Sequence, residues 1–269
     1  MQTATKILNY PKKLMGDGDS NTKLRKNGAA FETLGLSLSP HKSAGLGNLC
    51  THASSGCIAS CLNEQGLASV FNAIKEARKR RTEIFYRDRD WFIGRLKTEI
   101  ANRCKLAKKR GTRVAVRLNV FSDVIWERVA PSIFTDFPDV SFYDYSKHPK
   151  RFGAILPNYW VTFSRSEIND QDCQRILESG GNVAVAFADM SGDFTDEMTT
   201  DGRFVGNRAG LQTLPKTWKG FQVIDGDISD LRFEDTRGRK RGRVVGLRLK
   251  AHSTKARAQA IESGFAVQC

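Results

Sequence analysis

Apolar residues recur in short, nearly continuous runs that are rich in β-branched and aromatic side chains, mostly in the second half of the chain. The runs cover 113–119, 140–146, 160–165, 182–188, 221–227 and 243–249, and a weaker seventh covers 34–39. Strands that are buried on both faces of a parallel sheet have this composition. The pattern therefore predicts a sheet of six or seven strands with parallel neighbours.

Helical patterns separate several of these predicted strands. They cover about 66–85, 91–109, 124–134, 170–179 and 254–263. Alternating strands and helices are typical of α/β proteins, and seven or eight such units would close a (β/α)8-type (TIM-like) barrel. We expect an α/β fold with an irregular barrel of this kind, formed as a single domain by 34–269 after an N-terminal extension over 1–33.

The charge balance bears on possible partners. Lys and Arg outnumber Asp and Glu by 43 to 29, which gives a net charge of +14, and 40% of the 269 residues are hydrophobic. A polyanion such as DNA or RNA is the natural partner of so basic a protein, although the charge could simply solubilise it. No apolar run approaches the ~20 residues of a membrane span, and no apolar signal segment begins the chain, so we expect a cytoplasmic protein.

Basic residues gather in three clusters, over 75–81, 103–110 and 237–243. Separate clusters could follow a phosphate backbone, whereas a single cluster is more often a solvated face. We expect contacts with double-stranded DNA from seven of these side chains: Arg78, Lys79, Arg80, Arg81, Arg239, Lys240 and Arg241.

Three of the six cysteines lie within twelve residues, in the segment 48–66. They are Cys50, Cys57 and Cys61. Without a signal segment, such a cluster indicates a metal or catalytic site more often than a disulfide, although chance placement in a buried turn is the alternative. The spacing C-x6-C-x3-C fits neither paired C-x2-C zinc sites nor a ferredoxin run. We expect one metal ion, zinc or alternatively an iron–sulfur cluster, with His52 or His41 as a fourth ligand.

Polar residues follow the ends of the predicted strands, where barrel enzymes build their active sites. Each has a structural alternative: Asp123 could cap a helix, Asp225 could form a turn, and Glu167 could interact with the dipole of the helix that follows it. The site candidates are Asn119, Ser122, Asp123, Trp126, Glu127, Tyr143, Asp144, Tyr145, Lys147, Ser164, Asp225, Asp227, Asp230 and Arg232.

Several stretches, in one order along the chain, resemble a protein family of bacteriophages and their actinobacterial hosts. They are 47–63, 117–127, 142–147, 162–167, 224–233 and 246–250. The family is similar to a branch of the phage DNA deazaguanine transglycosylases, which resemble the zinc-bearing TIM-barrel tRNA-guanine transglycosylases. The resemblance implies that the protein exchanges guanine in DNA for a 7-deazaguanine base, in the host cytoplasm if it is phage-encoded.

Base exchange needs a carboxylate nucleophile at the sugar C1′ and a second carboxylate for proton transfer. We expect Asp225 or Asp227 as the nucleophile and Asp123 as its partner. We expect three side chains to hydrogen-bond the base: Asp144, Asn119 and Ser164. Three aromatic side chains are expected to stack on a flipped nucleotide: Tyr143, Tyr145 and Trp126.

Other classes of protein remain open. The transglycosylases carry C-x-C-x2-C near the C-terminal end, whereas the cysteines here lie near the N-terminus. The cluster could instead hold an iron–sulfur centre, or Asp225, Asp227 and Asp230 could bind Mg2+ in a nuclease. A zinc-stabilised DNA-binding protein without enzymatic activity is the third alternative.

Overall fold

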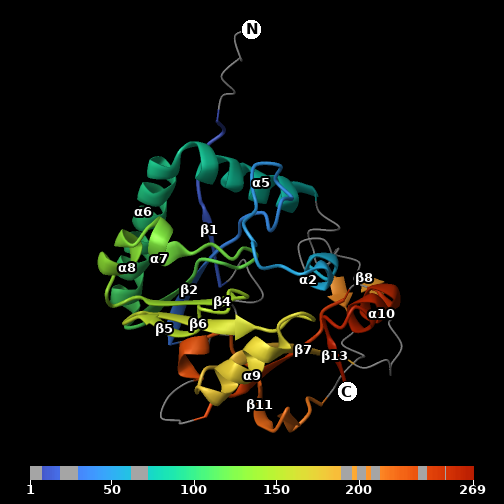
Figure 1. Ribbon diagram of the computed structural model, residues 1–269. Helices are drawn as coiled ribbons and strands as arrows, with labels where there is room; N and C mark the ends of the chain where they lie inside the picture. The colour runs from blue at the N-terminus through green and yellow to red at the C-terminus, as the bar shows by residue number, and fades with distance from the viewer. Residues whose placement is uncertain are drawn as a thin grey trace.

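The computed structural model describes residues 8–18, 30–61, 72–188, 196–198, 204–206, 213–235, 241–251 and 253–269. The chain has a mixed α/β fold around one large, mostly parallel sheet (Figure 1). Seven neighbouring strands of this sheet are parallel, and they are the seven that the sequence predicts. In sheet order they are β2 (Phe31–Leu36), β3 (Arg113–Arg117), β4 (Ser141–Ser146), β6 (Tyr159–Ser164), β7 (Val183–Ala188), β12 (Val244–Arg248) and β11 (Phe221–Asp225).

Short strands complete the sheet at its edges and ends. β1 (Met15–Asp17) pairs antiparallel with β2, and β10 (Thr217–Trp218) pairs antiparallel with β11. β5 (Gly153–Leu156) pairs antiparallel with β6, and β13 (Val267–Gln268) pairs parallel with the end of β7. A separate ribbon joins β8 (Asp196–Met198) to β9 (Phe204–Gly206). Since β1 lies in the sheet, part of the predicted extension over 1–33 belongs to the fold.

A closed barrel is not confirmed. The sheet begins at β1 and ends at β10, and within the described ranges no strand pairing joins these edges. Helices separate β2 from β3, β3 from β4 and β6 from β7, as predicted, whereas β4 and β6 are joined through β5.

Helices cover one face of the sheet, here called the outer face. α5 (Asn72–Arg87), α6 (Arg89–Arg110), α7 (Trp126–Val129) and α8 (Ser132–Thr135) lie over β2, β3 and β4, and α9 (Asp170–Glu178) lies over β6 and β7 (Figure 1). α6 contributes Phe92, Leu96 and Ile100, none of them exposed, to this core. α6 begins where Asp88 accepts a hydrogen bond from the Trp91 amide and ends at Gly111 in the left-handed conformation.

Two helices lie beside the carboxyl ends of the strands. They are the short α2 (Ser55–Ala59), which carries Cys57, and α10 (Thr254–Glu262) near the C-terminus (Figure 1). No helix in the described part of the chain is long and apolar enough to cross a membrane.

The segment 226–235, which follows β11, crosses the opposite, inner face of the sheet; we call it the crossing segment. Its Asp230 accepts a hydrogen bond from Arg117 of β3, and the ring of Phe233 lies 5.5 Å from that of Phe31 in β2. Contacts of the crossing segment also reach β6, where the Trp160 ring lies 5.7 Å from that of Phe233. The crossing segment therefore runs across the inner face over β2, β3, β4 and β6.

Candidate functional site

Loops that follow β2, β3 and β4 meet at Asp123, at the carboxyl edge of the sheet. The Asp123 carboxylate accepts hydrogen bonds from the Ser146 hydroxyl (2.7 Å), the Lys147 amide (2.9 Å) and the Arg151 guanidinium (3.2 Å). Its own amide donates to the Leu49 carbonyl at 2.7 Å. Asp123 thus joins three loops, and helix capping, its structural alternative, is not its role here.

Arg151 extends this network, and the sequence analysis did not select it. Its guanidinium donates two hydrogen bonds to Glu127, at 2.7 and 2.8 Å, and one to the Tyr159 hydroxyl at 3.0 Å. Only 4% of the residue is exposed. In the sequence it follows Lys147, His148 and Lys150, so the stretch has the pattern of a solvated basic face, and no local signal marks Arg151 as buried.

Asn119 forms a second hub, four residues before Asp123 in the same loop. Its side-chain oxygen accepts from the Ser122 hydroxyl (2.9 Å), the Val124 amide (2.9 Å) and the Trp126 indole (3.1 Å). Its amide group donates to Asp144 and to the Val124 carbonyl. Every polar atom of the side chain is engaged inside the protein, so Asn119 shapes the loop rather than binding a base.

Asp144 lies at the buried end of this network. It accepts hydrogen bonds from the backbone amide of Asn119 at 2.7 Å and from the Tyr159 hydroxyl at 2.9 Å, and none of its surface is exposed. Burial raises the pKa of Asp144 to about 7, although these hydrogen bonds and the charges of Arg117 and Arg151 act against the rise. Asp144 is therefore not available to a base edge.

The expected stacking residues differ in their access to solvent. Trp126 and Tyr143 are 0% exposed, so neither can stack on a flipped nucleotide as expected from the sequence. Tyr145 is half-buried on the inner face, beneath the Arg117 guanidinium, which lies 4.6 Å from its ring centre. Ser164 is half-buried at the end of β6, and its carbonyl accepts a hydrogen bond from Asn169.

Asp230 ties the crossing segment to the inner face. Besides the ion pair with Arg117 at 2.8 Å, it accepts hydrogen bonds from the hydroxyls of Tyr143 (3.3 Å) and Tyr145 (3.4 Å). Arg232 is 2% exposed and pairs with Asp235 at 3.1 Å. Burial raises the pKa of Asp235 to about 6, against the opposing charge of Arg232. Asp230 and Arg232 thus hold the crossing segment in place.

Asp225 and Asp227 lie at the end of β11, beside two cations. Arg248 of β12 contacts the Asp225 carboxylate at 3.0 Å and the Asp227 carboxylate at 3.2 Å, and Lys250 contacts Asp227 at 3.4 Å. The Arg248 amide also donates to Asp227 at 2.9 Å. Both aspartates lie at the carboxyl edge of the sheet, as predicted.

The cysteine segment does not form the expected metal site. The Cys50 thiol donates to the Phe121 carbonyl at 3.5 Å, and burial raises the pKa of Cys50 to about 12. Cys57 lies beside Lys147; burial lowers the pKa of Lys147, but its interactions with Cys57 and Asp123 raise it above the ordinary value. Within the described residues no three side chains of His, Cys, Asp or Glu gather around a common point suited to a metal ion. Cys50 interacts electrostatically with both Cys57 and Cys61, and the expected zinc or iron–sulfur site stays a prediction.

The two histidines considered as fourth ligands have other surroundings. The ring of His52 lies 4.4 Å from that of His148, and its Nδ1 is 3.1 Å from the Thr51 hydroxyl. His41 adopts a positive φ of 49°, and its carbonyl accepts a hydrogen bond from Leu49. Among the described residues neither histidine belongs to a group of side chains that could hold a metal ion.

Glu167 connects the loop after β6 to the cysteine helix α2. Its carboxylate accepts hydrogen bonds from the Ser54 hydroxyl and the Gly56 amide, both at 2.7 Å. These hydrogen bonds lower the pKa of Glu167 although its partial burial acts the other way. As an alternative, the sequence predicts an interaction of Glu167 with the dipole of the helix that follows it. Instead Glu167 binds the N-terminus of α2, more than a hundred residues earlier in the chain.

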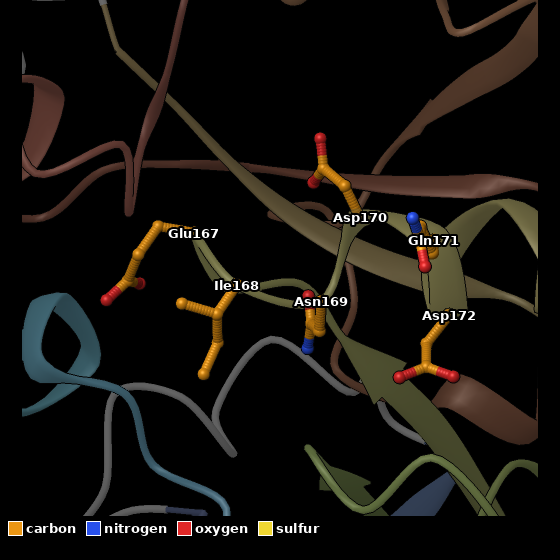
Figure 2. A pocket seen from close by; sticks show the side chains of 6 residues that line it. All are labelled: Glu167, Ile168, Asn169, Asp170, Gln171 and Asp172. Carbon is orange, nitrogen blue, oxygen red and sulfur yellow. The ribbon is translucent and has the colours of Figure 1, made fainter.

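The loop that carries Glu167 also lines a surface hollow of about 410 Å3. Figure 2 shows the Glu167 side chain turned towards α2, away from Asp170 and Asp172. The hollow is formed by one continuous segment, 167–172, which contributes three carboxylates and no cation. Such a lining does not suit a nucleic acid, so we place the candidate site at the meeting point of the loops and not in this hollow.

The basic residues expected to bind DNA are placed unequally. Arg78 is 8% exposed and lies over the Phe121 ring at 3.9 Å, so it cannot contact a phosphate in this arrangement. Arg81 is half-buried, and burial lowers its pKa. Lys79, Arg80 and Arg241 are exposed. Arg239 and Lys240 lie outside the described residues.

Comparison with known proteins gives one result. No curated protein and no solved structure matches the chain. A family model described as Gene product 88 matches residues 12–268, nearly the full length. This match confirms the expected membership in a phage family, while the likeness to transglycosylases remains a proposal. The chain belongs to the Gene product 88 (GP88) family of phage proteins.

Proposed function

We propose that this protein exchanges guanine in double-stranded DNA for a 7-deazaguanine base. The observation that carries the proposal is the contact of Asp230 with Arg117, because it brings the segment after β11 against the ends of β3 and β4. Asp227 lies three residues before Asp230, and Asp123 lies six residues after Arg117. Acidic groups from distant strands thus share the carboxyl edge of one sheet.

Asp227 is the proposed nucleophile. Its carboxylate attacks the sugar C1′, the bond from C1′ to the base nitrogen breaks, and the departing guanine takes a proton from the proton-transfer partner, which is thereby left as a carboxylate. Arg248 and Lys250 hold the Asp227 carboxylate in place. In the second half of the reaction the incoming base gives its proton to that carboxylate and displaces Asp227 from C1′, so the sugar carries the new base and both acids return to their starting forms.

Asp123 is the proposed proton-transfer partner, with Lys147 beside it. Burial lowers the pKa of Lys147, but its interactions with the nearby Cys57 and Asp123 outweigh this effect and raise the pKa above its ordinary value. A cation at this place can stabilise the negative charge that develops on the departing base. Tyr145 and Ser164, which are half-buried, remain candidates for contact with the base.

The basic surface supplies the DNA contact in this proposal. Lys79 and Arg80 on α5 are exposed, and α5 packs on the loop that carries Asp123 through Arg78 and Phe121. Phosphates bound at Lys79 and Arg80 would therefore place the duplex beside the candidate site. No step of the proposed reaction depends on zinc.

Incorporation of isotopically labelled guanine into duplex DNA tests this function. The wild-type protein should incorporate the label, whereas Asp227→Asn and Asp123→Asn should each reduce incorporation by about a thousandfold or more, since each removes a group that acts in the transition state. Asp136→Asn provides a matched control, because Asp136 pairs with Lys97 far from the carboxyl edge of the sheet. It should incorporate the label at the wild-type rate.

Two results would count against the proposal. Exchange at the wild-type rate in both Asp123→Asn and Asp227→Asn would remove the assigned roles. Absence of exchange in the wild type, together with Mg2+-dependent nicking of plasmid DNA, would favour the nuclease alternative.

A further inference from the structure

One stripe of helix α5 rests on the loops that form the candidate site. Arg78, Thr82 and Tyr86 are spaced four residues apart and so lie on one face of the helix. The Thr82 hydroxyl accepts a hydrogen bond from the Ser39 amide at 2.9 Å, in the loop after β2. The Tyr86 ring lies so close to Gly47 that no Cβ would fit there. This face of α5 therefore touches the same loops that hold Cys50 and Asp123.

Arg78 makes the contact nearest to the proposed chemistry. Its guanidinium lies 3.9 Å from the centre of the Phe121 ring, and the residue is 8% exposed. A desolvated cation over an aromatic ring is strongly attracted to it. The Phe121 carbonyl accepts a hydrogen bond from the Cys50 thiol, and Asp123 follows two residues later. Arg78 thus fixes the centre of the loop between Asn119 and Asp123.

We infer that Arg78 is a positioning residue, which acts through Phe121 to hold the loop of Asp123 in its working geometry. The expected effect of Arg78 on catalysis rests on the proposed function, whereas its effect on the position of the loop does not. It separates two roles within one basic cluster: Lys79 and Arg80 face solvent and bind phosphate, and Arg78 faces inward and orders the site. DNA affinity and catalysis should therefore respond to different residues of α5.

The test compares Arg78→Met with Arg78→Lys and with Arg89→Met. Arg89 is a matched control, because its guanidinium lies 3.8 Å from the Phe85 ring and donates to the Phe85 carbonyl, within its own helical region. Each variant is measured for duplex affinity, for kcat and KM in base exchange, and for the rate at which iodoacetamide alkylates Cys50, resolved by fragment-ion mass spectrometry.

Arg78→Met should leave duplex affinity and the KM for DNA unchanged and lower kcat by about tenfold or more, because a displaced catalytic loop loses orientation. Cys50 should be alkylated about tenfold faster, as expected when a desolvated cation–π contact no longer opposes local opening. Arg78→Lys keeps the cation and should restore both values in part. Arg89→Met should change neither.

The outcomes distinguish this inference from the proposed function. If the wild type exchanges no base but Arg78→Met still exposes Cys50 at wild-type DNA affinity, the proposed function fails and the positioning role stands. If Arg78→Met weakens DNA binding as much as Lys79→Ala does, and Cys50 labelling stays at the wild-type rate, Arg78 is a phosphate contact and the inference is overturned. Loss of kcat with equal changes in Arg89→Met would also overturn it, as a general effect on folding.

Discussion

At the scale of single residues, the candidate site rests on buried polar side chains whose hydrogen bonds are nearly all internal. Asn119 and Asp144 join the ends of β3 and β4 to each other, and Asp123 joins both to the cysteine segment through Leu49. A network with every member engaged specifies one geometry, and the low dielectric of the interior makes each broken bond expensive. The hub residues thus keep the loops rigid.

Asp144 gives this network a pH dependence. Burial raises its folded-state pKa to about 7, whereas in an unfolded chain an aspartate titrates near ~3.9. Between these values the folded state holds one proton more than the unfolded state, so stability falls as pH rises from about 4 to about 7. The free energy of unfolding of the wild type, relative to that of Asp144→Asn, should decrease by on the order of 2 kcal/mol between pH 5 and pH 7.5. Urea titrations at both pH values measure it, and an unchanged difference would show that Asp144 is ionised throughout.

At the scale of elements, α2 is a helix that cannot stand alone. It has five residues, and Ser54 caps it by accepting a hydrogen bond from the Cys57 amide. Short helices are marginal without tertiary support. Glu167 supplies that support from the loop after β6, and Gly56 leaves room for its carboxylate.

Glu167→Gln should loosen α2 without unfolding the protein. The variant loses a charge-assisted cap, which is worth about 1–2 kcal/mol. Amide hydrogen exchange at 55–58 should therefore accelerate by about tenfold, while exchange in β3 and β4 keeps its wild-type rate. Asp172→Asn, in the first turn of α9 and paired with Arg175, is the control and should leave α2 unchanged. Equal protection of α2 in both variants would show that Glu167 does not support it.

The sequence predicts the elements of this protein better than their assembly. Each of the seven parallel strands overlaps a run of β-branched and aromatic residues that predicts it, because most of these strands have two largely buried faces. β11 is the exception, with one buried residue among five. The strands β1, β5, β10 and β13 have two to four residues, too few for a period to be visible. The sequence does not predict α2 either, because five residues are too few for a helical period. The predicted helix over 124–134 is divided into α7 and α8 at Ala130 and Pro131.

At the scale of the whole molecule, the candidate site depends on pairings between residues far apart in the chain. Arg117 and Asp230 are 113 positions apart, and Glu167 lies 111 positions from Gly56. No local pattern carries such information, which is why the sequence identified Asp123, Asp227 and Asp230 as candidates but not Arg151 or Arg117 as their partners. The same holds for closure of a barrel. Alternating strands and helices predict a parallel sheet, whereas closure depends on whether its two edge strands pair with each other.

The surface charge predicts how DNA binds. The double variant Lys79→Ala with Arg80→Ala removes two exposed cations beside the site and should reduce the slope of log affinity against log salt by about 1.8. The double variant Lys108→Ala with Lys109→Ala removes two exposed cations at the other end of the sheet, before β3, and should leave the slope unchanged. Salt titrations of duplex binding by fluorescence anisotropy measure both. An equal change in the two double variants would mean that DNA does not dock at a defined face.

Nucleoside analysis of cellular DNA tests the central claim most directly. Cells that express the wild-type protein and are supplied with a 7-deazaguanine base should contain the corresponding deoxynucleoside in their DNA, detected by mass spectrometry after digestion. Cells that express Asp227→Asn at the same level should contain none, because the nucleophile proposed at the end of β11 is missing. Modified DNA in both strains, or in neither while the protein is folded and binds duplex DNA, would contradict base exchange at this site.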